Sequence, residues 1–382
     1  MRIAFLNWRD LTHPEGGGAE RYAQTICGGL AKRGHDVVLF CAAHGDAPAE
    51  ARLDGYRIVR SGGRAGVYPA SLMHMRREAR KGGSFDVVID TQNGLPFWTP
   101  LVSRTRVVSL VHHVHREQWP VVFGPVMARL GWWLESRVSP IVYRRTPCVT
   151  VSDRSRVELV ELGRHPDLVQ VIHNGTERPL AVGVPRAARP TMVVLGRLVP
   201  HKRVELAVDV LARLSPHHPD LELRIIGDGW WRSEIERHAA ASGVSERVHL
   251  LGYVDEATKH RELARAWFAL APSAKEGWGL NVVEAASHGV PTIAHHGAGG
   301  LSESVLDGVT GVLVHDVAEM AQVADRWLTD HASREQFGHN AQTLSHRYSW
   351  GSAVDQWEAF LETQVFGVDR SLDEVDPEVA SA

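Results

Sequence analysis

Short apolar runs alternate with helix-forming segments along this chain, and the alternation occurs in two separate sets. In the first set, the strand-like runs lie at residues 2–7, 36–41, 56–59, 86–90, 106–112 and 148–152. Helical patterns lie between them, as at residues 20–33 and 72–81. Such alternation predicts βαβ units, in which parallel strands form one sheet with helices on both of its faces.

The second set repeats this organisation. Its strand-like runs lie at residues 192–196, 221–227, 248–252, 267–272, 291–294 and 311–314. Residues 177–185 separate the two sets and contain prolines and a glycine with weak periodicity, which is typical of a linker. A chain of 382 residues with 44% hydrophobic content can bury two cores. We therefore expect an α/β protein of two doubly wound, Rossmann-like domains that face each other across a cleft, at residues 1–178 and 186–349.

The C-terminal part predicts one helix and a disordered tail. Apolar residues recur at helical spacing within residues 350–366, at Val354, Trp357, Phe360 and Leu361. Residues 367–382 are acidic and carry a proline, and this composition is typical of disorder.

The composition favours a cytoplasmic protein. No apolar run reaches the roughly 20 residues that a membrane-spanning helix needs. Residues 1–6 enter a strand directly, without the charged and apolar regions of a signal peptide. The three cysteines, Cys27, Cys41 and Cys148, have no metal-like spacing, which fits a reducing compartment.

The net charge of -3 hides an uneven distribution. Residues 1–180 carry 24 lysines and arginines against 17 acidic residues, which leaves a net charge of -10 for the remainder. A basic first half favours an anionic partner, either a membrane surface or a phosphate-bearing acceptor, and nothing indicates nucleic acid. A solvated, arginine-rich face is the plain alternative.

Two glutamates, Glu276 and Glu284, bracket a predicted strand-loop-helix turn. Gly277 and Gly279 between them allow the backbone close to a ligand, and the start of the following helix suits a phosphate. A carboxylate accepts two hydrogen bonds, which fits a vicinal diol of a ribose or a pyranose. The pair therefore indicates a sugar and phosphate site, unless it merely brackets a turn with a surface glutamate at each end.

Basic residues follow the first predicted strand of the second set. Arg197 stands just after this strand, and Lys202 follows five residues later. Ligands bind at such carboxyl ends of strands in open α/β sheets, and these two cations would neutralise a diphosphate. Gly227, after the next strand, would admit a flat ligand such as a nucleobase. Ordinary surface cations and turn glycines are the alternatives.

The first half adds a glycine loop and a histidine cluster. Residues 16–18 are all glycine and lie between the first strand and its helix, where they permit a phosphate, a sugar or another backbone to approach. His112, His113 and His115 follow the strand at residues 106–112, where one ring could hydrogen-bond a sugar hydroxyl or assist proton movement. The sequence places no cysteine or carboxylate nearby to complete a metal site.

Together these motifs resemble the glycosyltransferase family 4 enzymes of GT-B fold. The resemblance covers about residues 2 to 362, and the motifs stand in the family's order. They are Gly17-Gly18-Ala19-Glu20, Arg33-Gly34-His35-Asp36-Val37, His112, His173-Asn174-Gly175, Gly196-Arg197-Leu198 with Lys202, Gly227-Asp228-Gly229, Gly252-Tyr253-Val254, the Glu276 and Glu284 pair, and Tyr348-Ser349-Trp350.

The resemblance implies a nucleotide-sugar donor on the C-terminal domain and an acceptor on the N-terminal domain, which the helix at 350–366 completes. Arg197 and Lys202 would contact the diphosphate, Glu284 the ribose and Glu276 the transferred sugar. His112 would lie beside the reacting sugar, so that His112, Arg197, Lys202 and Glu276 form the catalytic set. The remaining donor-binding residues implied are Gly17, Gly18, Gly227, Tyr253, Val254, Gly277, Trp278, Gly279, Leu280 and Asn281.

The implied reaction is a retaining hexose transfer that needs no metal ion or other cofactor. The donor would be GDP-mannose or a UDP-hexose, and the acceptor a lipid, a polysaccharide or another glycan of cell-envelope or glycoconjugate synthesis. Since no nucleophilic carboxylate is evident beside the anomeric carbon, we expect same-face attack assisted by the leaving phosphate. A sugar-nucleotide epimerase of the same fold and a non-catalytic nucleotide-sugar-binding module remain alternatives.

Two segments suggest peripheral contact with the cytoplasmic face of a membrane. Residues 71–81 predict a basic helix with Leu72, Met73 and Met75, and residues 119–143 include Trp132 and Trp133. Apolar and basic residues together favour an anionic bilayer. Core packing of the tryptophans is the alternative.

Overall fold

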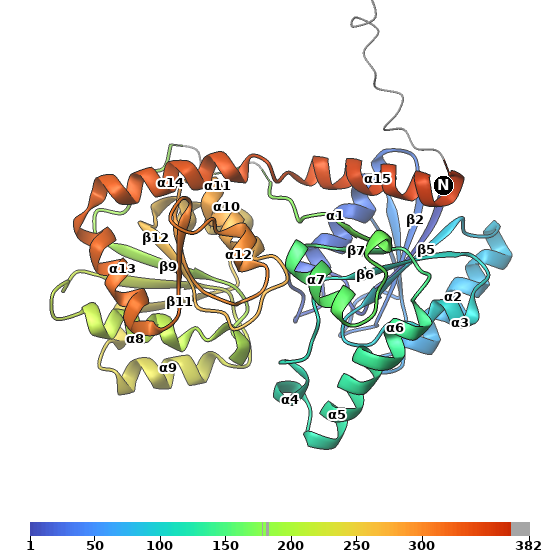
Figure 1. Cartoon of the computed structure of the whole chain (residues 1–382), viewed down its shortest axis with the longest axis horizontal. Helices are drawn as coiled ribbons and strands as arrows, with labels where there is room; N and C mark the ends of the chain where they lie inside the picture. The colour runs from blue at the N-terminus through green and yellow to red at the C-terminus, as the bar shows by residue number, and fades with distance from the viewer. Residues whose placement is uncertain (178, 181–182, 368–382) are drawn as a thin grey trace, which may run out of the picture.

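The computed structural model describes residues 1–177, 179–180 and 183–367. Two α/β lobes lie side by side, and helices near the C-terminus run along one edge of both (Figure 1). The predicted tail at 367–382 lies outside the described residues, except for Gly367.

The first lobe contains an eight-stranded sheet in the order β3-β4-β2-β1-β5-β6-β7-β8. Its strands are β1 (Arg2–Leu6), β2 (Asp36–Cys41), β3 (Glu50–Leu53), β4 (Tyr56–Arg60), β5 (Val87–Gln92), β6 (Arg106–Val111), β7 (Cys148–Thr150) and β8 (Val169–Val171). All neighbouring strands are parallel except β3 and β4. The sequence prediction lacked β3 and β8, because β3 is a polar hairpin strand at one edge and β8 is a three-residue strand at the other.

The second lobe contains a six-stranded, wholly parallel sheet in the order β11-β10-β9-β12-β13-β14. Its strands are β9 (Thr191–Leu195), β10 (Glu222–Ile226), β11 (Val248–Gly252), β12 (Phe268–Ala271), β13 (Thr292–His295) and β14 (Gly311–Val314). All six match predicted runs. The sequence order of strands reverses between β9 and β12, and this is where open α/β sheets form their binding crevices.

Helices connect the strands in both lobes. The first lobe has α1 (Gly18–Lys32), α2 (Val67–Gly82), α3 (Thr99–Val102), α4 (Trp119–Val122), α5 (Pro125–Trp133), η1 (Leu134–Val138), α6 (Ser139–Val142), α7 (Asp153–Glu161) and η2 (Pro166–Leu168). The second has η3 (Pro200–Lys202), α8 (Glu205–Leu214), α9 (Arg232–Ala241), η4 (Ser245–Arg247), α10 (Glu256–Arg265), α11 (Leu280–Ser287), α12 (Leu301–Ser304), α13 (Val317–Thr329) and α14 (His331–Ser345). The last helix is α15 (Trp350–Phe366).

Each sheet has helices and a hydrophobic core on both faces. In β1, Ile3 and Phe5 pack on the side of α1, whereas Ala4 and Leu6 pack on the side of α2. Side chains that alternate along a strand point to opposite faces, so a strand buried on both sides is apolar throughout. The second sheet has cores of its own. The predicted α/β fold with two doubly wound, Rossmann-like domains is confirmed.

Helix α15 belongs spatially to the first lobe, although it ends the described chain (Figure 1). Trp357 is fully buried in the core beside α1, and its indole Nε1 donates a hydrogen bond to the Tyr22 hydroxyl at 2.5 Å. Gly29 on α1 leaves room for Val354, because any Cβ at this position would collide with the valine side chain. The end of the chain therefore packs against its beginning. The boundaries 1–178 and 186–349 stay a prediction.

Candidate active site

Loops from the carboxyl ends of the strands bring the two lobes into contact. Arg197 follows β9, and its guanidinium Nη1 donates to the carbonyl of Glu15, in the loop before α1, at 3.2 Å. Tyr253 follows β11, and its hydroxyl donates to the carbonyl of Pro14, in the same loop, at 3.3 Å. The lobe predicted to bind the donor therefore contacts the segment that leads into the predicted glycine loop.

Two glycines allow this close approach. A Cβ at Gly17 would lie 3.1 Å from Nε of Arg197, and a Cβ at Gly277 would lie 2.6 Å from the carbonyl oxygen of His112. The first contact is tight and the second impossible without movement of the backbone. Gly18, by contrast, begins α1 and borders open space. Gly17 and Gly277 are therefore contact points between the lobes.

Glu276 is largely buried, with 12% of its side chain exposed, and is paired with Lys202. Its carboxylate accepts a hydrogen bond from the Lys202 ammonium and another from the Ser273 hydroxyl, the latter at 2.7 Å. Burial by itself would raise the pKa of Glu276, but the charge and the hydrogen bond of Lys202 outweigh it and hold the pKa below its usual value. Glu276 is therefore ionised at neutral pH and neutralises the lysine predicted to bind phosphate.

Glu284 has a lysine partner that the sequence reading missed. Its Oε1 lies 2.7 Å from Nζ of Lys259 on α10, and this lysine also lies 2.8 Å from a carboxylate oxygen of Glu256. The two acidic partners outweigh the effect of burial and raise the pKa of Lys259 above its usual value. Only the pairing of Lys259 with Glu256 had a signal in the sequence, because residues three positions apart share one face of a helix.

A hollow between the lobes lies beside Glu284. It is lined by Arg21, Glu177, Glu256, His260, Leu280, Glu284 and Trp350, among other residues. Glu276 is not among the residues that line it, so the two glutamates do not border this hollow together. Glu276 lies in the loop before α11 and pairs with Lys202. Glu284 lies within α11 and pairs with Lys259.

The ring of His112, unlike the rings of His113 and His115, has a buried nitrogen without a hydrogen-bond partner among the described residues. Its side chain is buried, and its Nε2 has no hydrogen-bond partner among the described residues. Burial, with a smaller effect of His115, lowers the pKa of His112 to about 4. A buried and unpartnered ring nitrogen is costly unless a ligand pairs with it.

The other two histidines are already engaged. His113 Nε2 lies 2.9 Å from the side-chain oxygen of Gln118, and His115 Nδ1 lies 3.0 Å from a carboxylate oxygen of Glu135. Of the three rings, His112 is therefore the one with a buried nitrogen that has no partner among the described residues. The sequence prediction that no carboxylate completes a metal-ligand set with these histidines is not contradicted by Glu135, which contacts His115 alone among the three. The contact was not foreseen, and the position of Glu135 as a lone acid within a tryptophan-rich run was the available signal.

Several predicted donor residues use their side chains for packing. Trp278 is buried, and its ring centroid lies 4.4 Å from that of His173 and 4.8 Å from that of Tyr348. The Asn281 side-chain amide donates to the carbonyl of Leu195 at 3.0 Å, which ties α11 to the end of β9. These two residues can therefore contact a ligand between the lobes mainly through their backbone.

The remaining predicted positions shape the edge of the second sheet. Gly279 precedes α11 with a φ of 90°, and Gly227 has a φ of 122° and pairs with Gly252. These φ values favour glycine. Tyr253 is 62% exposed, whereas Val254 packs partly into a core beneath it. Leu280 begins α11 and borders the hollow.

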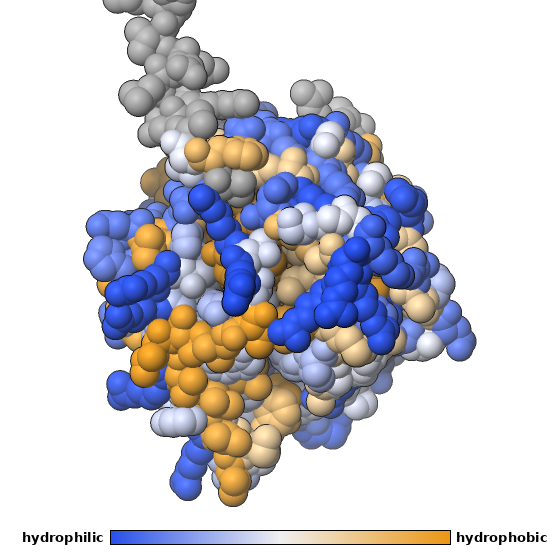
Figure 2. All heavy atoms as spheres, turned by 90° about the vertical axis from the view of Figure 1, so that its right-hand side faces the viewer, coloured by the Kyte–Doolittle hydropathy of each residue, from blue (hydrophilic) through white to orange (hydrophobic). Residues whose placement is uncertain are grey.

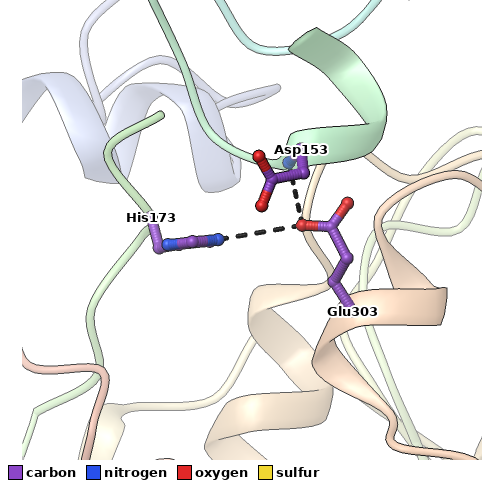
Figure 3. Close-up of side chains that lie close together, drawn as sticks. All are labelled: Asp153, His173 and Glu303. Atoms are coloured by element: carbon purple, nitrogen blue, oxygen red, sulfur yellow. Dashed lines mark hydrogen bonds and ion pairs between the residues drawn. The ribbon is translucent and has the colours of Figure 1, made fainter. Parts of the chain in front are cut away.

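Asp153, His173 and Glu303 form the one group of three potential metal ligands in the part of the chain that the structure describes. Figure 3 shows that Glu303 approaches the other two from the opposite side. Its carboxylate accepts hydrogen bonds from the backbone N–H groups of Asp153 and Arg154 at 2.8 and 2.6 Å. His173 Nε2 lies 3.7 Å from the same carboxylate. Because both carboxylate oxygens bind the start of α7, we interpret the group as a contact that joins the two lobes.

Two family models match the chain in succession. The model for glycosyltransferase family 4 matches residues 16–178, and that for glycosyl transferases group 1 matches residues 182–344. Together they cover most of both lobes. The chain belongs to the family 4, group 1 glycosyltransferases. The resemblance drawn from the motifs is confirmed.

This family 4 glycosyltransferase is similar to several curated proteins. It is 32% identical to exopolysaccharide phosphotransferase SCO2592 of Streptomyces coelicolor, over 55% of this chain and 22% of that protein. It is 26% identical to alpha-D-kanosaminyltransferase of Streptomyces kanamyceticus, over 74% and 77% of the two chains. It is 27% identical to MMP alpha-(1->4)-mannosyltransferase of Mycolicibacterium hassiacum, over 96% and 98%.

Solved structures of the same fold span almost the entire glycosyltransferase. Sucrose-phosphate synthase from Thermosynechococcus elongatus has a TM-score of 0.81 at 19% identity and covers 96% of this chain and 99% of its own. Anabaena Alr3699/HepE in complex with UDP-glucose has a TM-score of 0.74 at 20% identity, over 95% and 100% of the two chains. These neighbours support the GT-B fold. Among the described residues, no helix is long and apolar enough to cross a membrane.

Proposed function

We propose that this glycosyltransferase transfers a hexose from a UDP- or GDP-linked donor to a hydroxyl group of a glycan or lipid acceptor. The observation that carries the proposal is the contact between the donor-side residues and His112. Arg197 and the loop after Glu276 reach from the second lobe to the first, and the unpartnered His112 ring nitrogen is buried at that junction. Such an arrangement fits a ligand whose phosphates need cations and whose sugar needs a hydrogen-bond partner.

The diphosphate would bind through Arg197 and Lys202. Lys202 is neutralised by Glu276 in the present structure, so a bound diphosphate would share the lysine with this carboxylate. As the bond to the sugar breaks, negative charge grows on the leaving phosphate, and fixed cations stabilise that charge in the transition state. These two residues would therefore contribute to the rate as well as to donor binding.

The sugar and the ribose would use the two glutamates differently. Glu276, with its position fixed by Ser273 and Lys202, would accept hydrogen bonds from hydroxyl groups of the hexose. Glu284 would accept those of the ribose, and Lys259 would hold its carboxylate in place. His112 remains neutral above about pH 4, so its ring would act as a hydrogen-bond partner of the hexose and not as a fixed positive charge.

The stereochemistry we propose is retention, without a metal ion. The bond from the anomeric carbon to the phosphate oxygen breaks, the acceptor oxygen bonds to the same face, and the acceptor proton passes to the leaving phosphate. A covalent glycosyl-enzyme adduct on any aspartate or glutamate, detected by mass spectrometry of denatured enzyme, would contradict this route. An unchanged rate after treatment with a chelator is expected, and loss of activity that added metal restores would overturn metal independence.

Known relatives support the hexose and leave the nucleotide open. The curated names include an aminosugar transferase and a mannosyltransferase, and one structural neighbour was solved with UDP-glucose. We therefore retain both UDP- and GDP-linked hexoses as donors. The acceptor class, a glycan or a lipid-linked glycan, is part of the same proposal.

A thermal-shift screen with UDP- and GDP-sugars tests the donor. A donor that binds the folded enzyme at 100 times its Kd should add about 2.7 kcal/mol of stability. Labelled donor incubated with a cell-envelope extract then tests the reaction. A labelled glycan supports transfer, whereas an interconverted donor indicates an epimerase and binding without product indicates a non-catalytic module.

Two glutamate variants test the division of roles. Glu284→Gln should weaken donor binding about tenfold or more, because a charged hydrogen-bond acceptor contributes about 1.5–3 kcal/mol. Glu276→Gln should lower kcat by a similar or larger factor with a smaller effect on donor affinity. Glu234→Gln on the exposed face of α9 is the matched control and should behave as wild type. Unchanged donor affinity in Glu284→Gln would refute the ribose assignment.

A further inference from the structure

Helix α5 exposes its large apolar residues and buries its small ones. Among its described side chains, Ala128 and Gly131 are the buried ones. Val126 is 78% exposed, Met127 55% and Trp133 54%. A typical amphipathic helix at the surface of a globular protein has the opposite arrangement, with its large apolar residues toward the core and its polar residues toward water.

The close packing of α5 explains why its small residues face inward. A Cβ at Gly131 would overlap the indole ring of Trp119, so α5 lies directly against α4. The Trp119 Nε1 donates to Glu135 at 2.6 Å, which fixes this indole from the other side. Because α5 packs against α4 through its small residues, Val126, Met127 and Trp133 remain exposed.

Neighbouring elements extend this surface. Leu101 on α3 is 67% exposed, Val122 on α4 is 54% exposed and Phe123 follows at 37%. We call Leu101, Val122, Phe123, Val126, Met127 and Trp133 the apolar face. Figure 2 shows apolar surface gathered at the lower part of this end of the molecule, with hydrophilic side chains around it. Contiguous exposed apolar surface of this kind marks an interaction site.

The positive charge of the first half is concentrated in the same segment. Residues 61–147 contain 12 lysines and arginines against 5 acidic residues, whereas the rest of residues 1–180 is balanced at 12 against 12. The Arg64 guanidinium lies 6.0 Å from the ring centre of Phe123, and Arg76 donates to the carbonyl of Val102 at 3.0 Å. Arg129 and Arg137 are exposed and form no ion pair within the described ranges.

The geometry points to an anionic lipid bilayer as the partner of the apolar face. Apart from Leu101 on α3, the face lies on a projection of the first lobe formed by α4 and α5 (Figure 1), and a projection of apolar side chains enters a lipid surface more readily than it fits a flat protein partner. Arginines beside these side chains would bind anionic headgroups, and a tryptophan suits the interface between lipid and water. A second copy of this chain on the same face would instead bring two sets of arginines together, and like charges disfavour such a contact.

This surface overlaps the second segment that the sequence suggested, residues 119–143, and differs from the prediction in the part played by α2. Met75 is buried and Leu72 packs partly into a core, so α2 contributes Met73 as its exposed apolar side chain. Trp119 is buried, whereas Trp133 is exposed. Helices α3 to α5 therefore supply the apolar contact, and α2 supplies basic residues.

Docking on this face would place the reaction centre near the membrane. Helix α4 begins at Trp119, only seven residues after His112 along the chain. The loop between them connects the buried ring to the apolar face. A lipid-borne acceptor could therefore reach the cleft without leaving the bilayer. The docking itself is independent of the donor and acceptor proposed above.

Co-sedimentation of the full chain with vesicles tests the proposal. Wild type should bind vesicles that contain phosphatidylglycerol at least tenfold more strongly than vesicles of phosphatidylcholine alone. The double variant Val126→Ser, Met127→Ser should lose at least tenfold of this binding at any salt concentration. Arg129→Gln with Arg137→Gln should weaken binding mainly at low salt, because exposed charges are screened as salt rises.

Matched controls separate docking from folding and from the donor site. Val309→Ser changes an exposed valine of the second lobe and should bind vesicles as wild type does. All variants should keep the melting temperature and the donor-induced thermal shift of wild type. A wild-type protein without any such shift would contradict the proposed donor while leaving the vesicle result intact. Equal binding by wild type and the apolar variant, or loss of a wild-type dimer in that variant by light scattering, would overturn membrane docking.

Discussion

At the scale of single residues, the site depends on charges and rings whose partners are distant in the sequence. Glu276 is ionised although it is buried, because Lys202 compensates its charge, and Glu284 is held by Lys259. His112 has no such partner within the described residues and stays neutral. The lobe interface thus combines neutralised pairs with a buried ring nitrogen that could pair with a ligand.

The first prediction concerns pH and His112. Its pKa is about 4 in the folded protein, against an ordinary value of 6.5, because burial disfavours the charged ring. The unfolded chain therefore binds a proton at higher pH than the folded one. Stability from this residue is complete above about pH 6.5 and falls toward pH 4, by at most about 1.4 kcal/mol per pH unit.

Urea unfolding at several pH values checks this prediction. The free energy of unfolding of His112→Asn should fall less steeply between pH 6.5 and 4 than that of wild type. His346→Gln, a change at an exposed position, should follow wild type. Parallel curves for wild type and His112→Asn would show that His112 does not titrate as we expect.

At the scale of elements, two helices that both carry tryptophan, α5 and α15, differ in how much of it they bury. Helix α15 buries both of its tryptophans, Trp350 and Trp357, in the core of the first lobe, whereas α5 exposes Trp133. The difference arises from what each helix packs against. Helix α15 lies along the core beside α1. Helix α5 lies against α4, where the absence of a side chain at Gly131 makes room for the Trp119 indole.

The second prediction compares Trp357 with Trp133. Trp357→Ala should lower the free energy of unfolding by about 3–5 kcal/mol, because it leaves a cavity in the core. It also removes the hydrogen bond to the Tyr22 hydroxyl. Trp133→Ala should change stability in water by less than about 0.5 kcal/mol, since the indole is exposed. Denaturant unfolding measures both, and equal losses would contradict the packing of α15 described above.

At the scale of the whole molecule, the two lobes are in contact around the cleft. Arg197 and Tyr253 reach the loop before α1, Lys275 pairs with Glu158, and Glu303 binds the start of α7. An enzyme that assembles its site from two domains excludes water when these contacts form. The present arrangement therefore corresponds to a closed state.

The third prediction tests closure at Gly277. Gly277→Ala would place a methyl group 2.6 Å from the carbonyl of His112, across the junction of the lobes. The lobes should then stay further apart, so kcat should fall at least tenfold while donor affinity changes less. Small-angle X-ray scattering should show a larger radius of gyration than wild type.

A glycine that borders open space provides the control. Gly63→Ala adds the same methyl group where nothing lies within 4 Å, and it should leave activity and dimensions unchanged. Wild-type kcat in Gly277→Ala would show that the contact with His112 is not needed for transfer.

Much of the fold and part of the site could be predicted from local patterns in the sequence. Apolar runs of the right length revealed twelve of the strands, since burial on both sides of a parallel sheet leaves a local signature. The edge strands β3 and β8 lack this signature. Arg197, Lys202, Glu276 and Glu284 could be placed near strand ends because such ends meet at one edge of a sheet, and their roles toward a donor stay a prediction.

The sequence alone therefore determined the two α/β domains and the family. Tertiary structure decided which histidine is free, which lysines pair with the glutamates, where the glycines touch the opposite lobe and which face of α5 meets water. Local periodicity reports only that a residue is buried or exposed on average. Pairing and orientation depend on groups far away in the chain, and these come together only when the lobes pack.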